Sequence, residues 1–338
     1  MSNPISGLGK SITGFVDKAV DDVSKTVDST MQKASTDAQK ALGYTGQSRF
    51  DGDVKSAADL IQSGVNQVQA GVDTSMGPLG PPPTLSKPVV MITGLTMQAS
   101  SYDPMAQHLA SNPKNGPVAV YVVADGKFHQ GSVTGPVMNP QQAQSAKIFE
   151  VQYIDPKAAP TEKAPQIAQA MKAIQGATGQ SNVDVVCHSA GCTDFRLYLQ
   201  QRTGADASMG IDHTVFIGPA SHGTEMGNVG DAVGAPLGLK QAGGELAVGS
   251  SLVDNLNQNW SNQLGQMKGG LTIVGLKGAP TASPEGLVDG DGYMPADSVG
   301  MPGAKTVMLQ GVNPTPLMHL WEVHYSGVIN TVDQALSS

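Results

Sequence analysis

The chain has 338 residues, of which 14% are charged and 4% are aromatic, and its formal net charge is −8 at pH 7. This length exceeds one average domain and suits a single α/β domain with an appended segment. The negative charge argues against a nucleic-acid partner and against electrostatic attraction to an anionic membrane. The 41 glycines and 22 prolines are typical of long loops on a folded scaffold.

Residues 1–76 are rich in serine, alanine and glutamine, and their apolar residues recur at helical spacing over 15–34 and 54–72. The pattern predicts an N-terminal helical extension that packs as a hairpin on itself or on the main domain. Contact of these helices with a membrane surface or with a partner is the alternative. Residues 77–87 contain three consecutive prolines and predict a linker, because such a run favours extended backbone and cannot continue a helix.

The first 19 residues lack the basic start, continuous apolar stretch and small-residue cleavage site of a secretory signal. No segment of the sequence approaches the roughly 20 apolar residues that span a bilayer. We therefore expect a cytoplasmic protein, or one exported by a route that reads no such signal.

From residue 88 onward, short apolar runs alternate with helical patterns. The apolar runs predict strands at 88–93, 118–123, 148–153, 183–187, 214–217, 271–274 and 306–309. The helical patterns predict helices at 102–111, 164–176, 190–201 and 323–336. Apolar strands separated by helices imply an α/β domain over residues 88–338, with a mainly parallel sheet and helices on both faces. In such a sheet, functional sites form at the carboxyl ends of the strands.

The segment Cys187-His188-Ser189-Ala190-Gly191 lies between a predicted strand and a predicted helix. A serine in this position is typical of the nucleophile elbow of serine hydrolases, where a strained backbone tolerates little bulk two residues to either side. Gly191 fits that pattern, and Cys187 is a larger variant. Ser189 is therefore the candidate nucleophile.

Cys187 and Cys192, which flank Ser189, are the only cysteines in the chain. Two buried, reduced thiols are one interpretation, and a bridge between them is the other.

A serine nucleophile needs a base, an orienting acid and donors to the oxyanion. The loop that starts at Gly94 follows an apolar strand, the position that supplies one backbone N–H of the oxyanion hole in α/β-hydrolases. The second donor is the residue after the nucleophile. The expected donors are therefore the N–H groups of Leu95 and Ala190.

The stretch 88–336 resembles bacterial lipases of the α/β-hydrolase superfamily. Residues 89–95 are similar to the strand and His-Gly loop of these lipases, with Thr93 where histidine is usual. Residues 183–191 resemble their elbow, and 217–224 resemble the turn after the next strand. The resemblance implies the α/β-hydrolase fold.

Asp291-Gly292-Tyr293-Met294-Pro295 is similar to the segment that carries the catalytic aspartate in these lipases, and Asp289 is the alternative acid. His319 begins a segment that resembles their histidine loop, and His324 is the alternative base. The resulting order of Ser189, Asp291 and His319 is the order of an α/β-hydrolase triad.

The resemblance implies a serine carboxylic ester hydrolase, most closely a lipase or phospholipase that cleaves acyl esters through an acyl-serine intermediate. The expected partner is a lipid or another acyl ester. A short-chain or polyester esterase, an acyltransferase and a non-catalytic binding protein are the alternatives. No cofactor and no metal are expected, although some related lipases hold a structural calcium ion near the segment that corresponds to Asp289 and Asp291.

Residues 252–257 resemble a piece of chain found under lipase lids. A lid within 227–270 would shield an apolar acyl groove and open at a lipid surface. A loop insertion with one short packing helix is the alternative.

Overall fold

The computed structural model describes residues 76–203, 209–224, 240–283, 286–312 and 318–337. The predicted N-terminal extension and part of the predicted lid lie outside the described residues. Among the described residues, no helix has both the length and the apolar character needed to cross a membrane.

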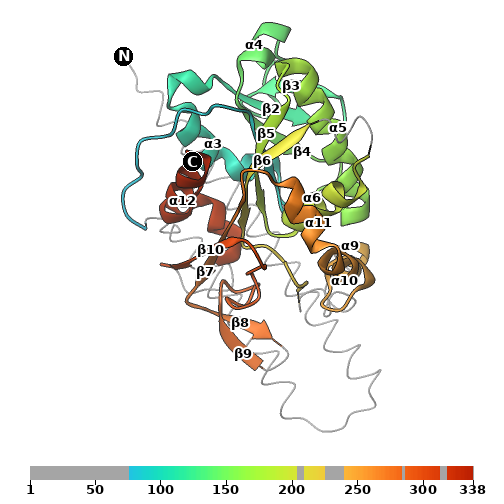
Figure 1. Ribbon diagram of the computed structural model, residues 1–338. Helices are drawn as coiled ribbons and strands as arrows, with labels where there is room; N and C mark the ends of the chain where they lie inside the picture. Colours follow the sequence, from blue (N-terminus) through green and yellow to red (C-terminus); the bar gives the residue numbers. More distant parts are fainter. Residues whose placement is uncertain (1–75, 204–208, 225–239, 284–285, 313–317, 338) are drawn as a thin grey trace, which may run out of the picture. The chain divides into compact units, whose positions relative to one another are not determined.

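An eight-stranded sheet in the order β10-β7-β6-β5-β1-β4-β2-β3 forms the centre of the described domain (Figure 1). All neighbouring strands in it are parallel except β2 and β3. The strands are β1 Val89–Ile92, β2 Val118–Val122, β3 Lys127–Gln130, β4 Ile148–Gln152, β5 Asn182–His188, β6 Gly210–Ile217, β7 Leu271–Lys277 and β10 Lys305–Gln310. All seven predicted strands are present, so the mainly parallel sheet is confirmed.

Three strands were not predicted, and all three are antiparallel additions. β3 is a short polar strand at the sheet edge, where it pairs with β2. β8 (Ala279–Ser283) and β9 (Gly286–Gly290) form a separate two-stranded hairpin after β7.

Helices cover both faces of the sheet (Figure 1). The α-helices are α3 Asp103–Ala110, α4 Pro140–Ser145, α5 Pro160–Thr178, α6 Ala190–Gln201, α9 Lys240–Leu246, α10 Ser251–Gln258, α11 Trp260–Gln266 and α12 Ser326–Leu336. Three 3-10 helices are η1 Ala99–Tyr102, η2 Pro113–Asn115 and η4 Met318–His324. The bounds of α6 agree with the predicted ones. The predicted helix 323–336 is divided between the end of η4 and α12.

Successive strand residues point to opposite faces and build two cores. On β5, Val185 packs into the core that includes Phe195 of α6 and Ile167 of α5. The next residue, Val186, packs into the core that includes Met105 of α3 and Ile329 of α12. This burial on both faces explains why the strands read as continuous apolar runs.

Residues 76–80, which precede β1 in the chain, lie against α12. Ser326 Oγ accepts a hydrogen bond from Met76 N at 2.8 Å and donates to Gly77 O at 2.8 Å. Gly80 N donates to Asn330 Oδ1 at 2.9 Å, and Leu85 is fully buried. The Pro-rich residues that were predicted to form a linker are thus hydrogen-bonded to the domain that follows them.

Candidate active site

Ser189 lies in the tight turn between β5 and α6. Its φ of 54° and ψ of −130° are a strained backbone conformation for a residue with a side chain. The backbone of Gly191, two residues later, lies close to the loop after β1. Any Cβ at this position would overlap the carbonyl oxygen of Thr93. The glycine of the predicted elbow is therefore required by a close backbone approach.

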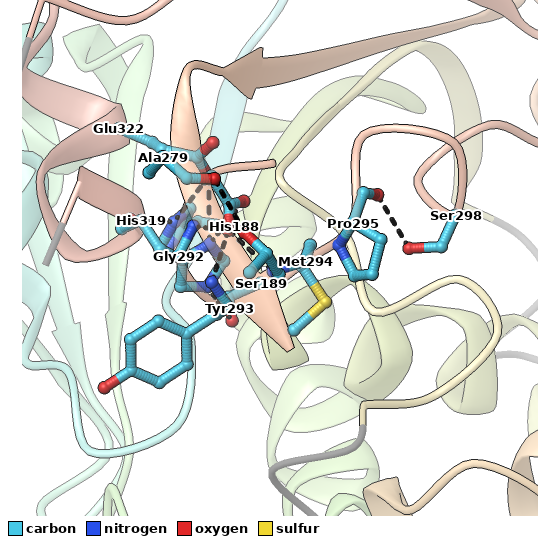
Figure 2. Close-up of polar contacts among 12 residues, drawn as sticks. His188, Ser189, Ala279, Gly292, Tyr293, Met294, Pro295, Ser298, His319 and Glu322 are labelled. Atoms are coloured by element: carbon cyan, nitrogen blue, oxygen red, sulfur yellow. Dashed lines mark hydrogen bonds and ion pairs between the residues drawn. The ribbon is translucent and has the colours of Figure 1, made fainter. Parts of the chain in front are cut away.

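The three residues predicted as a triad meet at the carboxyl edge of the sheet. His319 Nε2 lies 2.7 Å from Ser189 Oγ (Figure 2). His319 Nδ1 lies 2.9 Å from Asp291 Oδ2. Both Asp291 and His319 are buried. A base that touches a serine hydroxyl with one nitrogen and a carboxylate with the other can accept the serine proton.

Backbone hydrogen bonds hold the acid in this position. Asp291 Oδ1 accepts from the N–H groups of Tyr293 at 2.8 Å and Met294 at 2.6 Å. The carbonyl of Asp291 accepts from the N–H of His319 at 3.0 Å. The Tyr293 ring stacks on the His319 ring with centroids 5.1 Å apart and an interplanar angle of 22°. The turn after β9 therefore places the carboxylate and also covers one face of the imidazole.

A second carboxylate, which the sequence analysis missed, contacts the same imidazole. Glu322 Oε2 lies 3.3 Å from His319 Nδ1 and 3.2 Å from His188 Nε2 (Figure 2). Glu322 is fully buried and stands three residues after His319 on η4. The only sequence signal for it is this spacing, which puts the two side chains on one face of a helical turn.

Burial and charge act in opposite directions on these groups. Burial disfavours the imidazolium, but the carboxylates of Asp291 and Glu322 outweigh it and raise the pKa of His319 above its ordinary value. Burial raises the pKa of Asp291. Burial also opposes ionisation of Glu322, yet the hydrogen bonds from His188 and His319 lower the pKa of that carboxyl. The site therefore favours a positive charge on His319.

The two alternative residues are held elsewhere. Asp289 is exposed, and its Oδ1 accepts from Gly278 N at 2.6 Å. His324 Nε2 lies 2.9 Å from the carbonyl oxygen of Ser101. Within the described part of the chain, neither residue forms a hydrogen bond or ion pair with Ser189 or His319.

The loop that carries the first predicted oxyanion donor passes close to the nucleophile. A Cβ on Gly94 would lie 3.0 Å from Ser189 Cβ. Among the described residues, the backbone N–H groups of Leu95 and Ala190 donate to no other protein group. The oxyanion role of these two groups stays a prediction.

The two cysteines are buried and unbridged, and their Sγ atoms lie 2.7 Å apart. They belong to the core beneath the elbow, on the face that α5 and α6 cover.

Two groups of side chains in the described residues have the ligand types and spacing of a metal site. One is His188, His319 and Glu322, which already bond to one another. The other is Asp184, Asp212 and His213, where the ammonium of Lys87 lies 2.7 Å from Asp212 and supplies the positive charge itself. Asp289 and Asp291, which lie in the segment near which some related lipases hold calcium, are in neither group. The expectation that the protein needs no cofactor stays a prediction.

Residues 252–257, which resemble the piece under lipase lids, fall within α10. Val253 and Leu256 of this helix are buried, and Asn257 Oδ1 accepts from Arg196 of α6 at 2.8 Å. α10 is thus packed on the domain, and residues 227–239 of the segment in which a lid was considered lie outside the described residues.

Comparison with known proteins agrees with this fold. A family model described as an alpha/beta hydrolase of unknown function (DUF915) matches residues 84–274. No curated protein matches the sequence.

Two solved structures are similar in fold. The product of the Listeria innocua gene lin2722 has a TM-score of 0.50 and 19% identity, covering 75% of this chain and 94% of its own. The mature form of the Bacillus licheniformis lipase BlEst2 has a TM-score of 0.50 and 14% identity, covering 78% of this chain and 96% of its own. At these identities the likeness concerns the fold alone.

Proposed function

The chain belongs to the family of alpha/beta hydrolases of unknown function (DUF915) whose model matches residues 84–274, and on that premise we propose that it is a serine carboxylic ester hydrolase. The observation that carries the proposal is the 2.7 Å contact between Ser189 Oγ and His319 Nε2, with Asp291 on the other imidazole nitrogen. Fold alone would not support an activity, whereas a nucleophile, a base and an acid in contact do.

In the proposed reaction, Ser189 Oγ attacks the ester carbonyl carbon while His319 Nε2 takes the hydroxyl proton. Asp291 accepts the hydrogen bond of His319 Nδ1–H, which fixes the tautomer and stabilises the imidazolium. The N–H groups of Leu95 and Ala190 hold the oxyanion of the tetrahedral intermediate.

Collapse of that intermediate transfers the proton from His319 to the leaving alcohol and leaves the acyl group on Ser189. A water molecule, deprotonated by His319, then releases the carboxylic acid. Every proton transfer uses groups of this chain, so the scheme requires no redox or organic cofactor.

We assign the substrate to the acyl esters of lipids. Ile154 follows β4, Val312 follows β10 and Leu320 adjoins His319, and all three apolar side chains are exposed. Ile154 and Val312 lie on loops at the carboxyl edge of the sheet that carries Ser189, and Leu320 lies on η4 beside His319, so all three can contact an apolar acyl chain. The name of the Bacillus licheniformis lipase is consistent with this assignment.

The test is hydrolysis of p-nitrophenyl esters from acetate to palmitate by wild type, Ser189→Ala and His319→Ala, with circular dichroism to verify folding. A phospholipid and a triglyceride are assayed alongside. We expect activity in wild type alone and an optimum at long chains.

An optimum at acetate would instead identify a short-chain esterase. Transfer of the acyl group to an added alcohol in preference to water would identify an acyltransferase. Full activity in Ser189→Ala would contradict the mechanism, and a folded wild type inactive on every ester would contradict the proposed function.

A further inference from the structure

We infer that Glu322 is a second acid for His319, a positioning residue that holds the imidazole and supports its positive charge together with Asp291. The inference rests on the proposed function, because it assigns a role within the same site.

Glu322 lies close enough to His319 Nδ1 to accept part of the hydrogen bond that orients the imidazole. His319 Nδ1 faces Asp291 Oδ2 at 2.9 Å and Glu322 Oε2 at 3.3 Å. One N–H can be shared between two acceptors, the nearer one taking the larger part. Asp291 is therefore the main acceptor, and Glu322 remains within reach of the same hydrogen when the imidazole shifts.

The same oxygen also ties the base to the elbow. Glu322 Oε2 lies 3.2 Å from Nε2 of His188, the residue before the nucleophile. His188 Nε2 is also 3.1 Å from the carbonyl oxygen of His319, so this nitrogen faces two acceptors and carries the proton. His188 thus donates to Glu322, and the carboxylate connects the end of β5 with the histidine segment η4.

The glycine at position 218 leaves room for the Glu322 carboxylate. Gly218, the residue after β6, has a φ of 49°, and a Cβ there would overlap Glu322 Oε2. Glu322 Oε1 is buried with no hydrogen-bond partner among the described residues. A fully buried carboxylate is costly unless positive or donating groups compensate for the lost water, and here His188 and His319 do so.

The titratable groups that face Glu322 come from three elements. They are His188 at the end of β5, His319 on η4 and Asp291 in the turn after β9. His188 in turn contributes, after burial, to lowering the pKa of His324, which is also on η4. Burial keeps the pKa of His188 below its ordinary value, so His188 stays neutral. The charge of Glu322 therefore acts mainly on His319.

Removal of that charge has a predictable sign. A carboxylate next to an imidazolium favours the protonated form, so its loss lowers the pKa of His319. The base then becomes available at lower pH, and the acid limb of the kcat/KM profile moves down by about one pH unit. The imidazolium formed in the transition state loses the same support, so kcat on the plateau falls by about tenfold.

The experiment compares pH profiles of p-nitrophenyl ester hydrolysis for wild type and Glu322→Gln, which keeps the shape and acceptor oxygen while removing the charge. Glu150→Gln is the matched control, since Glu150 is equally buried but lies on β4 and contacts no member of the site. We expect the acid limb to shift in Glu322→Gln and to stay in place in Glu150→Gln. An unshifted limb in a folded Glu322→Gln protein would overturn the inference.

A second comparison uses the Asp291→Asn variant, so it remains informative if Glu322→Gln by itself fails to fold. If Glu322 takes over the imidazole N–H, Asp291→Asn loses less than the roughly 10⁴-fold seen when a triad has a single acid. The double variant Asp291→Asn/Glu322→Gln then loses at least tenfold more than Asp291→Asn. An Asp291→Asn protein as inactive as Ser189→Ala would overturn the inference.

Failure of the proposed function gives a different result. In that case wild type itself hydrolyses no ester and its Ser189 does not react with a fluorophosphonate. Failure of the inference alone leaves wild type active and reactive, with its pH profile unchanged by Glu322→Gln.

Discussion

At the scale of single residues, the site depends on Ser189, whose backbone has a strained, positive φ. A positive φ on a residue with a side chain costs on the order of 1–3 kcal/mol, which the packing around it must offset. The N–H of Ser189 donates to Ile217 O at 2.9 Å, which ties the elbow to β6. Gly191 allows the start of α6 to approach the carbonyl oxygen of Thr93.

Gly191→Ala should therefore damage both stability and catalysis. The added Cβ overlaps backbone, which cannot rotate away, so we expect a loss of about 1–3 kcal/mol in the free energy of unfolding and a lower kcat as the elbow moves. Urea unfolding and ester hydrolysis measure the two effects. Gly176→Ala is the control, because a Cβ at this exposed position of α5 meets nothing within 4 Å. It should be neutral or stabilising by up to about 1 kcal/mol. Equal stability of the two variants would contradict the packing argument.

The meeting of Ser189, Asp291 and His319 could be anticipated from sequence because each stands in a local motif with a recognisable spacing, while their catalytic roles stay a proposal. Ser189 has its glycine two residues later, and the segments at Asp291 and His319 resemble those of known lipases. Glu322 has no such motif, since its contact with His188 depends on η4 packing against the end of β5. That is a tertiary contact between residues 134 positions apart.

At the scale of elements, the continuous apolar strands were predictable because burial on both faces leaves a long run of apolar residues. β3 has the sequence KFHQ and lies at an edge, so its partly exposed residues carry no such run. The start of α5 was placed four residues late, because Pro160 occupies the first helical position and Pro165 lies inside the helix. Proline is favoured at a helix start, but its frequency in loops hides that signal.

One element carries an acidic residue that the apolar pattern of its strand would not predict. Glu150 on β4 is buried, and both its carboxylate oxygens lack a hydrogen-bond partner among the described residues. Burial, with a smaller contribution from Asp103, raises the pKa of Glu150 from 4.5 to about 8. The folded protein therefore holds this proton over a pH range in which the unfolded chain has lost it.

The sign of the effect on stability follows from linkage. Between about pH 4.5 and pH 8 the folded state binds more protons at Glu150 than the unfolded state, so the stability falls as pH rises. Glutamine does not titrate, so Glu150→Gln does not lose stability in this way. The difference in the free energy of unfolding, variant minus wild type, should therefore increase by up to a few kcal/mol between about pH 4.5 and pH 8. Urea unfolding at pH 4 and pH 8.5 provides the comparison, with pH 4 as the internal reference. A pH-independent difference would contradict the assignment.

A buried arginine joins α6 to the helices that follow the elbow in sequence. Arg196 donates to Gln263 Oε1 at 2.9 Å, Ser221 O at 3.0 Å and Asn257 Oδ1 at 2.8 Å. Its guanidinium also lies over the Trp260 ring, 5.2 Å from the centroid.

Arg196→Met keeps much of the apolar volume but leaves the buried acceptors on Gln263 and Ser221, and the partly buried one on Asn257, without this donor. We expect a loss of about 2 kcal/mol or more, because each unsatisfied buried group retains its desolvation cost. The urea midpoint measures this, with Lys172→Met on the exposed side of α5 as control. A midpoint shift no larger than that of the control would show that the network contributes little.

At the scale of the whole molecule, the α/β-hydrolase domain begins before its first strand. Leu85 is buried, its N–H donates to Asn115 Oδ1 at 2.8 Å, and its carbonyl accepts from Lys147 Nζ at 2.6 Å. The sequence predicted a linker here because prolines exclude regular structure. Extended backbone can still be buried and hydrogen-bonded, which composition does not reveal.

Two truncations test this boundary. A chain that begins at residue 76 keeps all of these contacts and should remain folded and active. A chain that begins at residue 88 exposes the site of Leu85 and should be less stable by about 2 kcal/mol or more. Thermal unfolding and ester hydrolysis of both chains give the comparison. Equal melting temperatures would show that residues 76–87 are dispensable.

The central claim is that Ser189 forms the covalent intermediate, and the most direct measurement is the reaction of the whole protein with a fluorophosphonate, followed by peptide mass spectrometry. Activated serine hydroxyls react with this probe, and ordinary serines do not. We predict one adduct, on Ser189, that is absent in Ser189→Ala and strongly reduced in His319→Ala. An unmodified Ser189 in folded wild-type protein, or an adduct on another residue alone, would contradict the account.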